Sequence, residues 1–544
     1  MSRAKSQPDN RSITSGSDFL QLDIADAPAG GRSGWLAERL RHAIADGRLP
    51  VGSRLPASRV LAAELRVSRG VVTEAYQRLT EDGHVAGRGR GGTVVVAAPP
   101  TAPGPPPPPR QAAPAAVFGA EPDAGVFDAL RAARARIDLS PGVPDLAAFP
   151  RTAWLRAERT VLASLSASDL GYGDPRGAPA LRRAVAVWLA RTRGFRADPD
   201  EVLIVAGVAQ ALGLLARALR VDGVTEIAVE DPGSLGARQH LWHSGFTTPP
   251  VPVDGHGVVV EELRACGAPV VLLTPAHQFP TGVVLGGERR RELMRWAGAG
   301  GLVVEDDYDA EHRYDRPPVP ALRAVLPEEV CYTGSVSKLL APALRVGWVV
   351  APSRYRDALI EAKRFADLGN AVLPQLVLAE LMESGQLERQ LRFLRRRHHR
   401  RRDAMIAAIR THLPDATVHG AAAGLHLMIT FTGGPPDTDL AAAALSRGVK
   451  TQPLSWHRTT PGPPGLVLGY AASTPTDIAA GVATLAAARR AMTTRAASTP
   501  PPGPPSSPGP PRHDHPRAAY RAVPRSPSGG SCGRGGAAPS VMSP

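Results

Sequence analysis

Lys338 is the residue of this chain whose setting most suggests chemistry. It lies between two apolar segments, 330–333 and 346–350, whose residue types predict buried strands. A third strand-like segment, 302–305, ends in carboxylates, and Asp306 comes directly after it. A loop lysine alone is usually solvated, so the meaning of Lys338 depends on the groups that accompany it.

Hydroxyl and guanidinium groups stand close to the lysine in sequence. Ser335 and Ser337 precede it, and Arg345 follows it by seven residues. A lysine that can form a Schiff base, a carboxylate that can face a pyridinium nitrogen, and hydroxyls with an arginine that can hold a phosphate are together what pyridoxal 5′-phosphate (PLP) requires. We therefore predict a PLP site in which positive charge from Arg345 and from the protonated ring nitrogen of the cofactor lowers the pKa of Lys338.

The whole chain is long, basic and unevenly composed. It has 544 residues, too many for one ordinary domain, and a net charge of +14, which suits a nucleic-acid partner. Its prolines gather at 99–114 and 500–511, stretches that cannot build a core and are predicted to be a linker and a tail. Widely spaced cysteines, a polar N-terminus and the lack of a long apolar run predict a cytoplasmic protein without a disulfide framework, metal site or membrane span.

Residues 35–96 have the pattern of a winged helix-turn-helix. Apolar spacing predicts helices at about 35–46, 58–65 and 68–81, and a glycine-rich hairpin follows at 85–96. Because the third helix comes after a tight turn, its N-terminal end is predicted to enter the major groove of DNA. The residues predicted to contact phosphates or bases are Arg54, Arg59, Ser68, Arg69, Thr73 and Arg88. The alternative is that these arginines only solvate a surface.

Strands and helices alternate in much of the remaining chain, which predicts an α/β fold with a largely parallel sheet. One strand, 202–205, leads through Gly207 into a helix, and such a helix N-terminus is a ready anion site. Residues 395–402 are all arginine or histidine, which invites a nucleic-acid interpretation. The apolar spacing on both sides instead predicts the solvated face of a long amphipathic helix.

Four motifs in the N-terminal region carry a resemblance to a known family. Leu-Pro-x-Ser-Arg, Leu-x-Val-Ser-Arg, Ala-Tyr-x-x-Leu and Gly-Thr-Val occur in the order of GntR-type DNA-binding domains. Further along, the segments around Asp306 and Lys338 resemble the fold-type I PLP aminotransferases. His-Gln-Phe-Pro at 277–280 is typical of the MocR-type GntR regulators, in which the two parts are fused.

The resemblance implies a domain organisation and a fold. An arm (1–32) precedes the GntR-type winged helix-turn-helix (33–97), a Pro-rich linker (98–134), an aminotransferase-like domain (135–490) and a disordered tail (491–544). The expected fold class is α/β, with a mostly parallel large domain of fold type I and a smaller α+β C-terminal domain. In the GntR family, the residues that match Arg59, Ser68 and Arg69 contact DNA.

The resemblance also implies which residues hold the cofactor. It places Asp306 at the ring nitrogen, with Asp307 as the alternative, and Tyr308 at the O3′ oxygen. It favours His277 as a pocket residue over a core histidine, and it assigns Tyr172 to the phosphate of the partner subunit's cofactor or else to a capped turn. The full implied set is Lys338, Asp306, Tyr308, Ser335, Ser337, Arg345, His277, Tyr172 and the backbone amides of Val208, Ala209 and Gln210.

Three positions depart from the pattern of the catalytic aminotransferases, and a fourth departs from that of related effector-binding regulators. Ser234 stands where an aromatic usually stacks on the ring, and Phe279 stands where an asparagine bonds O3′. Gly236 replaces an arginine of related effector-binding regulators, and Val467 replaces the arginine that binds the substrate carboxylate, with Arg458 as an unproven substitute. These departures predict that PLP itself, without an amino acid, changes the affinity for DNA.

The predicted protein is a PLP-dependent, sequence-specific transcriptional regulator that binds operator DNA. Its aminotransferase-like domain is expected to dimerise and to sense PLP or a PLP adduct. The resemblance implies a homodimer, since the family builds its cofactor pocket at a subunit interface and MocR-type members swap domains head to tail. One alternative is an active aminotransferase with a DNA-binding appendage, against which Ser234 and Val467 argue. Another is a cofactor-free dimerisation scaffold, against which Lys338, Asp306 and Arg345 argue.

Overall fold

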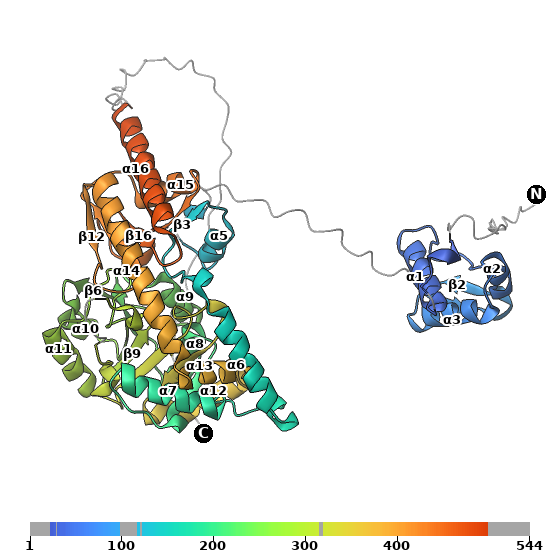
Figure 1. Cartoon of the computed structure of the whole chain (residues 1–544), viewed down its shortest axis with the longest axis horizontal. Coiled ribbons are helices and arrows are strands. Elements are labelled where there is room, and N and C mark those ends of the chain that lie inside the picture. The colour runs from blue at the N-terminus through green and yellow to red at the C-terminus, as the bar shows by residue number, and fades with distance from the viewer. Residues whose placement is uncertain (1–21, 29, 98–116, 120–121, 315–318, 499–544) are drawn as a thin grey trace, which may run out of the picture. The chain divides into compact units, whose positions relative to one another are not determined.

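The computed structural model describes residues 22–28, 30–97, 117–119, 122–314 and 319–498. These residues form two compact units, one within residues 1–111 and the other within residues 112–544 (Figure 1). Most of the predicted arm, the proline run of the linker and the tail beyond residue 498 lie outside the described residues.

The described part of the N-terminal unit contains three α-helices and a two-stranded hairpin. Helices α1 (Arg32–Ala45), α2 (Ser58–Glu64) and α3 (Arg69–Glu81) precede β1 (Val85–Gly87), which pairs antiparallel with β2 (Thr93–Val95). Apolar side chains at helical spacing meet in one core, because each helix turns a single apolar face inward. The core includes Leu36, Leu40, Ile44, Leu61, Val72, Tyr76 and Leu79.

Side-chain bonds between α2 and α3, and not side-chain caps, hold the starts of these two helices. Ser58 is the first residue of α2 rather than its cap, and Ser68 holds the N-cap position of α3 without a side-chain cap bond. Instead, Nε of Arg69 donates to Oγ of Ser58 at 3.3 Å. The hydroxyl of Tyr76 donates to the carbonyl of Pro56 at 2.8 Å. These two bonds fasten α3 to the beginning of α2.

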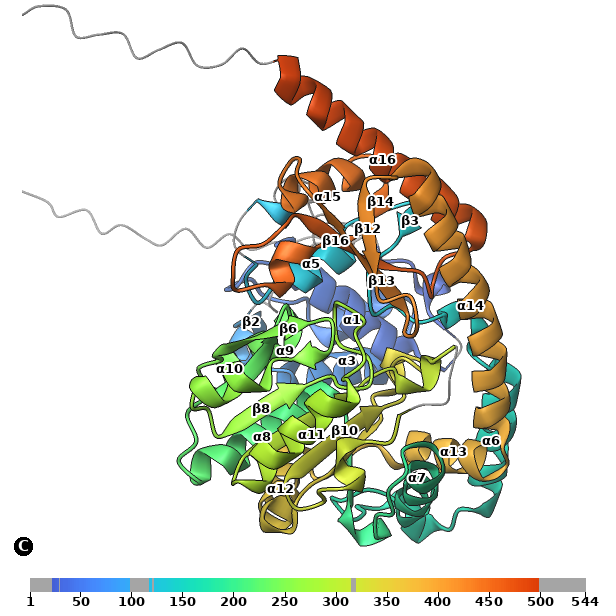
Figure 2. The same ribbon diagram turned by 90° about the vertical axis from the view of Figure 1, so that its left-hand side faces the viewer.

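An eight-stranded sheet forms the centre of the larger unit (Figure 2). Its strand order is β4–β11–β10–β9–β8–β5–β6–β7, and within it β10, β9, β8, β5 and β6 are neighbours that run parallel. The strands are β4 (Val202–Val205), β5 (Ile227–Asp231), β6 (Pro250–Asp254), β7 (Gly257–Val258), β8 (Val270–Leu273), β9 (Leu302–Asp307), β10 (Val330–Ser335) and β11 (Gly347–Val350). The α/β prediction with a mostly parallel sheet is confirmed.

Helices cover both faces of this sheet, as a parallel sheet requires. One face packs on α8 and α12, and the other packs on α7 and α13, with α10 and α11 farther along it. The helices of this part of the chain are α6 (Arg151–Ser164), α7 (Pro179–Thr192), α8 (Val208–Val221), α9 (Leu235–His243), α10 (Val260–Ala265), α11 (Gly287–Gly298), α12 (Ser353–Asp367) and α13 (Val372–Glu383).

A smaller domain packs above the strand ends. Its antiparallel sheet has the order β12–β13–β16–β15, and a separate parallel pair joins β3 to β14. The strands are β3 (Ile137–Asp138), β12 (Ala416–His419), β13 (His426–Phe431), β14 (Val449–Lys450), β15 (Gln452–Pro453) and β16 (Gly465–Gly469). The helices are α5 (Val126–Ala132), α14 (Gln386–His412), α15 (Asp437–Leu445) and α16 (Pro475–Ser498). Helix α14 runs from this domain down to α13 and α6 (Figures 1 and 2).

The predicted linker of 98–134 ends too late. Helix α5 belongs to the core of the smaller domain, and so does Phe118 before it. The ring of Phe118 stacks on Trp456 at 5.2 Å between centroids, and Phe127 meets the same indole edge-on at 6.2 Å. These aromatics bury too much apolar surface to remain in a linker. At the other end, α16 continues past the predicted boundary of 490 to Ser498.

The arginine run of α14 is only partly the solvated face that the spacing predicts. Arg397 and Arg401 both donate to the buried carboxylate of Asp145, at 2.8 and 2.7 Å. Arg402 lies over the ring of Tyr314 at 5.0 Å. These arginines hold α14 against the domain, so nucleic acid is not needed to explain them. Within the described residues, no helix is both long and apolar enough to cross a bilayer.

Candidate functional site

A cavity of about 900 Å³ lies where the carboxyl ends of the parallel strands meet the smaller domain. Crevices at this edge of α/β sheets are where such folds bind ligands. The cavity brings together most of the residues implied for the cofactor: Lys338, Asp306, Tyr308, Ser335, Ser337, Arg345, Val208 and Ala209. Gln210, His277 and Tyr172 do not line it.

Lys338 follows β10 and reaches the loop after β3. Its Nζ donates to the carbonyl of Gly142 at 2.6 Å. Gly142 has φ +78°, and a Cβ at this position would lie 3.2 Å from that Nζ, so the glycine makes room for the lysine. Burial lowers the pKa of Lys338, against the opposing charges of Asp309 and Asp306. The prediction that Arg345 lowers it is therefore wrong, because desolvation is the cause.

Asp306 and Asp307 at the end of β9 have separate roles. Asp307 forms a buried ion pair with Nε of Arg193 at 2.5 Å and accepts from the hydroxyl of Tyr332, so it is a structural residue. Asp306 faces the cavity, and its Oδ1 is buried without a hydrogen-bond partner in the part of the chain that the structure describes. Burial and the charges of Asp307 and Asp309 raise the pKa of Asp306 to about 7. An unpaired buried carboxylate beside Lys338 fits a pyridinium nitrogen.

We expect Asp306→Asn to stabilise the cofactor-free protein more at pH 8 than at pH 5. The folded-state pKa of about 7 lies above the ordinary 3.8, so the folded state holds more protons than the unfolded state between these values. Ionisation therefore costs stability as the pH rises toward 7, and asparagine cannot ionise. The stabilisation of the variant over the wild type should be larger at pH 8 than at pH 5 by on the order of 2 kcal/mol. Denaturant unfolding at the two pH values measures it. A gain that is equal at both pH values contradicts the assignment, and Asp307→Asn should destabilise at both.

A phosphate fits at the start of α8. Gly207 precedes this helix with φ +89°, and the first amides of a helix, here those of Val208 and Ala209, have no acceptor within it. A Cβ on Gly207 would lie 3.4 Å from the guanidinium of Arg345, which donates to the carbonyl of Ala206. Arg345 itself has a left-handed φ of +51°, a strained conformation for a non-glycine residue that is found at ligand sites.

The assignment of a phosphate to Gln210 is not supported. Its amide donates to the carbonyl of Gly207 at 3.1 Å, and its side-chain oxygen accepts from Ala206 N at 2.8 Å and from Lys363 Nζ at 3.0 Å. Its side-chain amide also donates to Asp367 at 2.7 Å, so the hydrogen-bonding groups of Gln210 are already used within the protein. The phosphate cradle is therefore shorter than the resemblance implies.

His277 lies behind the cavity instead of lining it, so the prediction of a pocket residue is wrong. Only 1% of the residue is exposed, and its Nδ1 lies 2.9 Å from Oδ2 of Asp309 and 3.0 Å from the hydroxyl oxygen of Tyr308. Burial and Asp309 raise the pKa of Tyr308 well above its ordinary value, which keeps the phenol protonated. His277 thus positions the hydroxyl that faces the cavity.

Several cavity residues escaped the sequence reasoning because they come from the smaller domain or from the predicted linker. Phe127 and Arg131 of α5 line the cavity, and Lys450 of β14 and Gln452 of β15 line it from another side. Arg458, the suggested substitute for a carboxylate-binding arginine, instead borders a surface hollow and donates to the carbonyl of Pro463. Tyr172 is 96% exposed, so its role toward a partner subunit stays a prediction.

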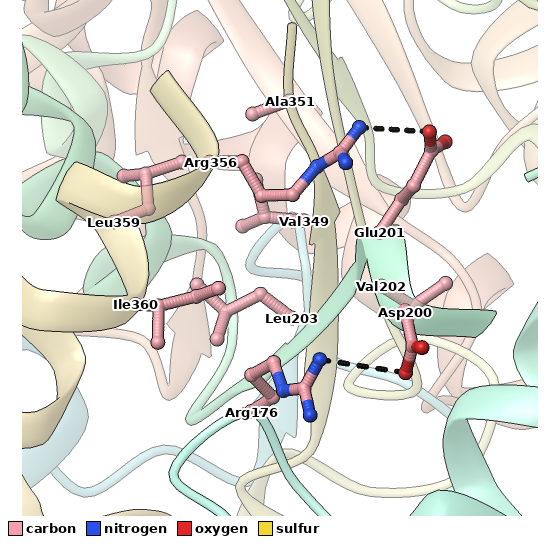
Figure 3. A pocket seen from close by; sticks show the side chains of 10 residues that line it. All are labelled: Arg176, Asp200, Glu201, Val202, Leu203, Val349, Ala351, Arg356, Leu359 and Ile360. Carbon is pink, nitrogen blue, oxygen red and sulfur yellow. Dashed lines mark hydrogen bonds and ion pairs between the residues drawn. The ribbon is translucent and has the colours of Figure 1, made fainter. Parts of the chain in front are cut away.

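A second hollow lies between β4, β11 and α12 and is drawn in Figure 3. Arg356 pairs with Glu201 at 2.7 Å and Arg176 pairs with Asp200 at 3.4 Å, while apolar side chains fill the space between these pairs. Its internal space is about 10 Å³, which is no more than one water molecule needs. The ion pairs fasten the edge of the sheet, and the hollow is not a ligand site.

The predicted DNA-contacting side chains are exposed on the N-terminal unit. The six residues, all exposed, are Arg54, Arg59, Ser68, Arg69, Thr73 and Arg88. Arg54 runs along the wing, since a Cβ on Gly92 would lie 3.5 Å from its Cδ. The hydroxyl of Thr73 donates to the carbonyl of Arg69 at 2.9 Å.

Charge pairing separates these arginines from three others of the unit. Arg41, Arg48 and Arg78 each pair with an acid. Among the described residues, no salt bridge joins an acid to any of the predicted contact arginines, which are Arg54, Arg59, Arg69 and Arg88. Arginines without a counter-ion beside the start of a helix that follows a tight turn are what binding to DNA phosphates requires.

A winged helix-turn-helix followed by a lysine pocket at the strand ends of an aminotransferase-like sheet defines a DNA-binding regulator with a cofactor domain. Residues 33–95 match the family of bacterial regulatory proteins named gntR, and residues 135–484 match the family aminotransferase class I and II. The chain belongs to the MocR-type GntR regulators, which combine these two domains, and its cofactor is PLP.

The similarity to two known regulators spans at least four fifths of this chain. The chain is 33% identical over 460 residues to the probable rhizopine catabolism regulatory protein MocR of Rhizobium meliloti, covering 83% of this chain and 92% of the relative. It is 31% identical over 438 residues to the pyridoxine biosynthesis transcriptional regulator PdxR of Corynebacterium glutamicum, covering 80% and 91%. The structure of the α-aminoadipate aminotransferase LysN of Thermus thermophilus matches with a TM-score of 0.63 and 26% identity, covering 70% of this chain and 97% of that one.

Proposed function

We propose that occupancy of the cavity by PLP, or by a PLP adduct with an amine, changes the affinity of the N-terminal unit for operator DNA. One observation supports this most. Lys338, Asp306 and Arg345 face one cavity, while the position of the catalytic aminotransferases' carboxylate-binding arginine holds Val467, which is buried in β16. The chain keeps groups that fit the cofactor and lacks the arginine that fixes a substrate for turnover.

Each cavity residue has a proposed task toward the cofactor. PLP, when bound, supplies an aldehyde that reacts with primary amines. Burial favours the neutral amine of Lys338, which is the nucleophilic form. Asp306 would hold the proton at the ring nitrogen, and the protonated Tyr308 would donate to the ring oxygen. Arg345, with Ser335, Ser337 and the amides of Val208 and Ala209, would fix the phosphate.

The proposed functional form is a homodimer. Four large apolar side chains between residues 155 and 172 are at least half exposed: Leu155, Leu162, Leu170 and Tyr172. Exposed apolar groups gathered in one segment are typical of an interaction surface. Tyr172 is the residue implied to reach a partner subunit's cofactor, so the same segment would bring it into the second site.

PLP alone is expected to change the DNA affinity. The reason is that positions 236 and 467 hold glycine and valine, so neither supplies an arginine to bind the carboxylate of an amino acid. The measurement is a gel-shift titration at fixed salt with cofactor-free protein, with PLP, and with PLP plus a panel of amines. An altered dissociation constant with PLP alone is the expected result. If PLP alone has no effect and one amine shifts binding sharply, then the effector is an amine and not PLP.

A further inference from the structure

Lys450 is a nearly buried cation with weak partners. It is 6% exposed and lines the same cavity as Lys338. Its Nζ lies 3.4 Å from the carbonyl of Arg131 at the end of α5 and 3.7 Å from Oδ2 of Asp138. Both distances exceed those of strong charge-assisted bonds, and an ammonium offers three donors. Among the described residues, no acid makes a closer ion pair with this ammonium.

The position of Lys450 places it apart from the cofactor contacts. Arg345, Ser335 and the start of α8 belong to the large domain, whereas Lys450 lies on β14 and pairs in register with Asp138 of β3. Four residues after Asp138, the carbonyl of Gly142 accepts from Lys338. The two lysines are thus held by opposite ends of one short segment, which spans at most about 14 Å even when fully extended.

We propose that Lys450 binds the carboxylate of an effector that also carries a primary amine, with the amine directed to Lys338 and the cofactor. This inference rests on the proposed function, because it names the class of amine that the cavity would accept. Lys450 supplies the positive charge that Gly236 and Val467 do not. A carboxylate at this position would give the ammonium of Lys450 a closer acceptor than the carbonyl of Arg131 or the carboxylate of Asp138.

The test compares unbranched amino acids, whose amine and carboxylate are separated by one to five methylenes, with the alkylamines of the same length that lack the carboxylate. Each is titrated into the PLP-loaded full chain without DNA, and the dissociation constant is taken from the change in the cofactor's visible absorption. At least one chain length should bind roughly tenfold more tightly as the amino acid, the gain typical of a bond to a charged group. Equal binding of every matched pair in the wild type overturns the proposal without any variant.

Variants at the site separate binding from a structural role. Lys450→Met keeps the apolar stem and removes the charge, so the amino-acid preference should fall to within about twofold while the alkylamine constants stay unchanged. Lys450→Arg should retain the preference. If Lys450 only holds the end of α5, both variants lower the thermal midpoint or leave it unchanged, but neither removes the preference, and the proposal fails.

The design also separates this inference from the proposed function. The absorption titration reports ligand choice alone, and a gel shift with the preferred amino acid reports the effect on DNA. Discrimination by absorption without any change in DNA affinity leaves Lys450 as the anchor and rules out the PLP adduct as the regulatory signal, so that regulation by PLP alone is then decided by the gel shift with and without PLP. A change in DNA affinity that alkylamines produce as strongly as amino acids supports regulation and overturns the role of Lys450.

Discussion

Lys338→Ala should lose all covalent attachment of PLP. Borohydride reduction of the wild-type protein followed by peptide mapping should place a pyridoxyl group on Lys338, and the variant should show none there and no aldimine band. The reason is that the amine is buried, has its pKa lowered by that burial, and lies in the cavity with Asp306. Noncovalent PLP should remain, because the phosphate contacts are untouched. Arg345→Ala should give the reverse result, with weaker retention and the label still on Lys338.

Two other lysines provide the internal controls for this experiment. Lys363 is fully buried and bonded to Asp367 at 2.6 Å, away from the cavity, so it should carry no label. Lys450 lines the cavity, and peptide mapping must therefore distinguish it from Lys338. A pyridoxyl group found mainly on Lys450 or Lys363 would remove Lys338 from the centre of the site.

The second large effect is expected in the N-terminal unit. Arg59→Ala and Arg69→Ala should each weaken specific operator binding by roughly 5- to 150-fold, which corresponds to about 1–3 kcal/mol for a good base contact. Both side chains are exposed at the beginnings of α2 and α3 and have no acidic partner among the described residues. The measurement is a gel-shift titration at fixed salt on the operator fragment that footprinting identifies.

Arg48→Ala is the matched control for these two variants. Arg48 is also exposed in the same unit, but Asp46 neutralises it at 2.8 Å. It should leave operator affinity nearly unchanged, and all three variants should keep the PLP absorption of the wild type. Unchanged affinity in Arg59→Ala and Arg69→Ala, or an equal loss in Arg48→Ala, would refute the assignment of the DNA-binding face.

Local motifs account for the parts of the fold and site that the sequence predicts. The strand before Lys338 and the strand before Asp306 each show a continuous apolar run, and their ends meet in the cavity because both belong to one parallel sheet. The helices of the N-terminal unit also follow from apolar spacing, which depends only on neighbouring residues. Alternation along β9 then separates Asp306 from Asp307, since successive residues of a strand face opposite sides.

Long-range pairing explains what the sequence did not predict. Lys450 faces the cavity because β14 pairs with β3, and each of these strands has only two residues, too few to show a periodic pattern. The arginine and histidine run of α14 has the sequence pattern of a solvated face. In the structure it contacts Asp145, which lies more than 250 residues earlier in the chain. His277 sits next to motif residues in sequence, but its partner Asp309 draws it behind Tyr308.

The stacking of Phe118 on Trp456 has a consequence for any attempt to study the sensor half by itself. The family match begins at residue 135, yet the folded unit already includes Phe118 and α5. A fragment that starts at 135 would leave the indole of Trp456 without either of its aromatic neighbours and would open the cavity on the side that Phe127 lines. The chain must therefore be cut before Val117 for the isolated half to retain its own ligand preference.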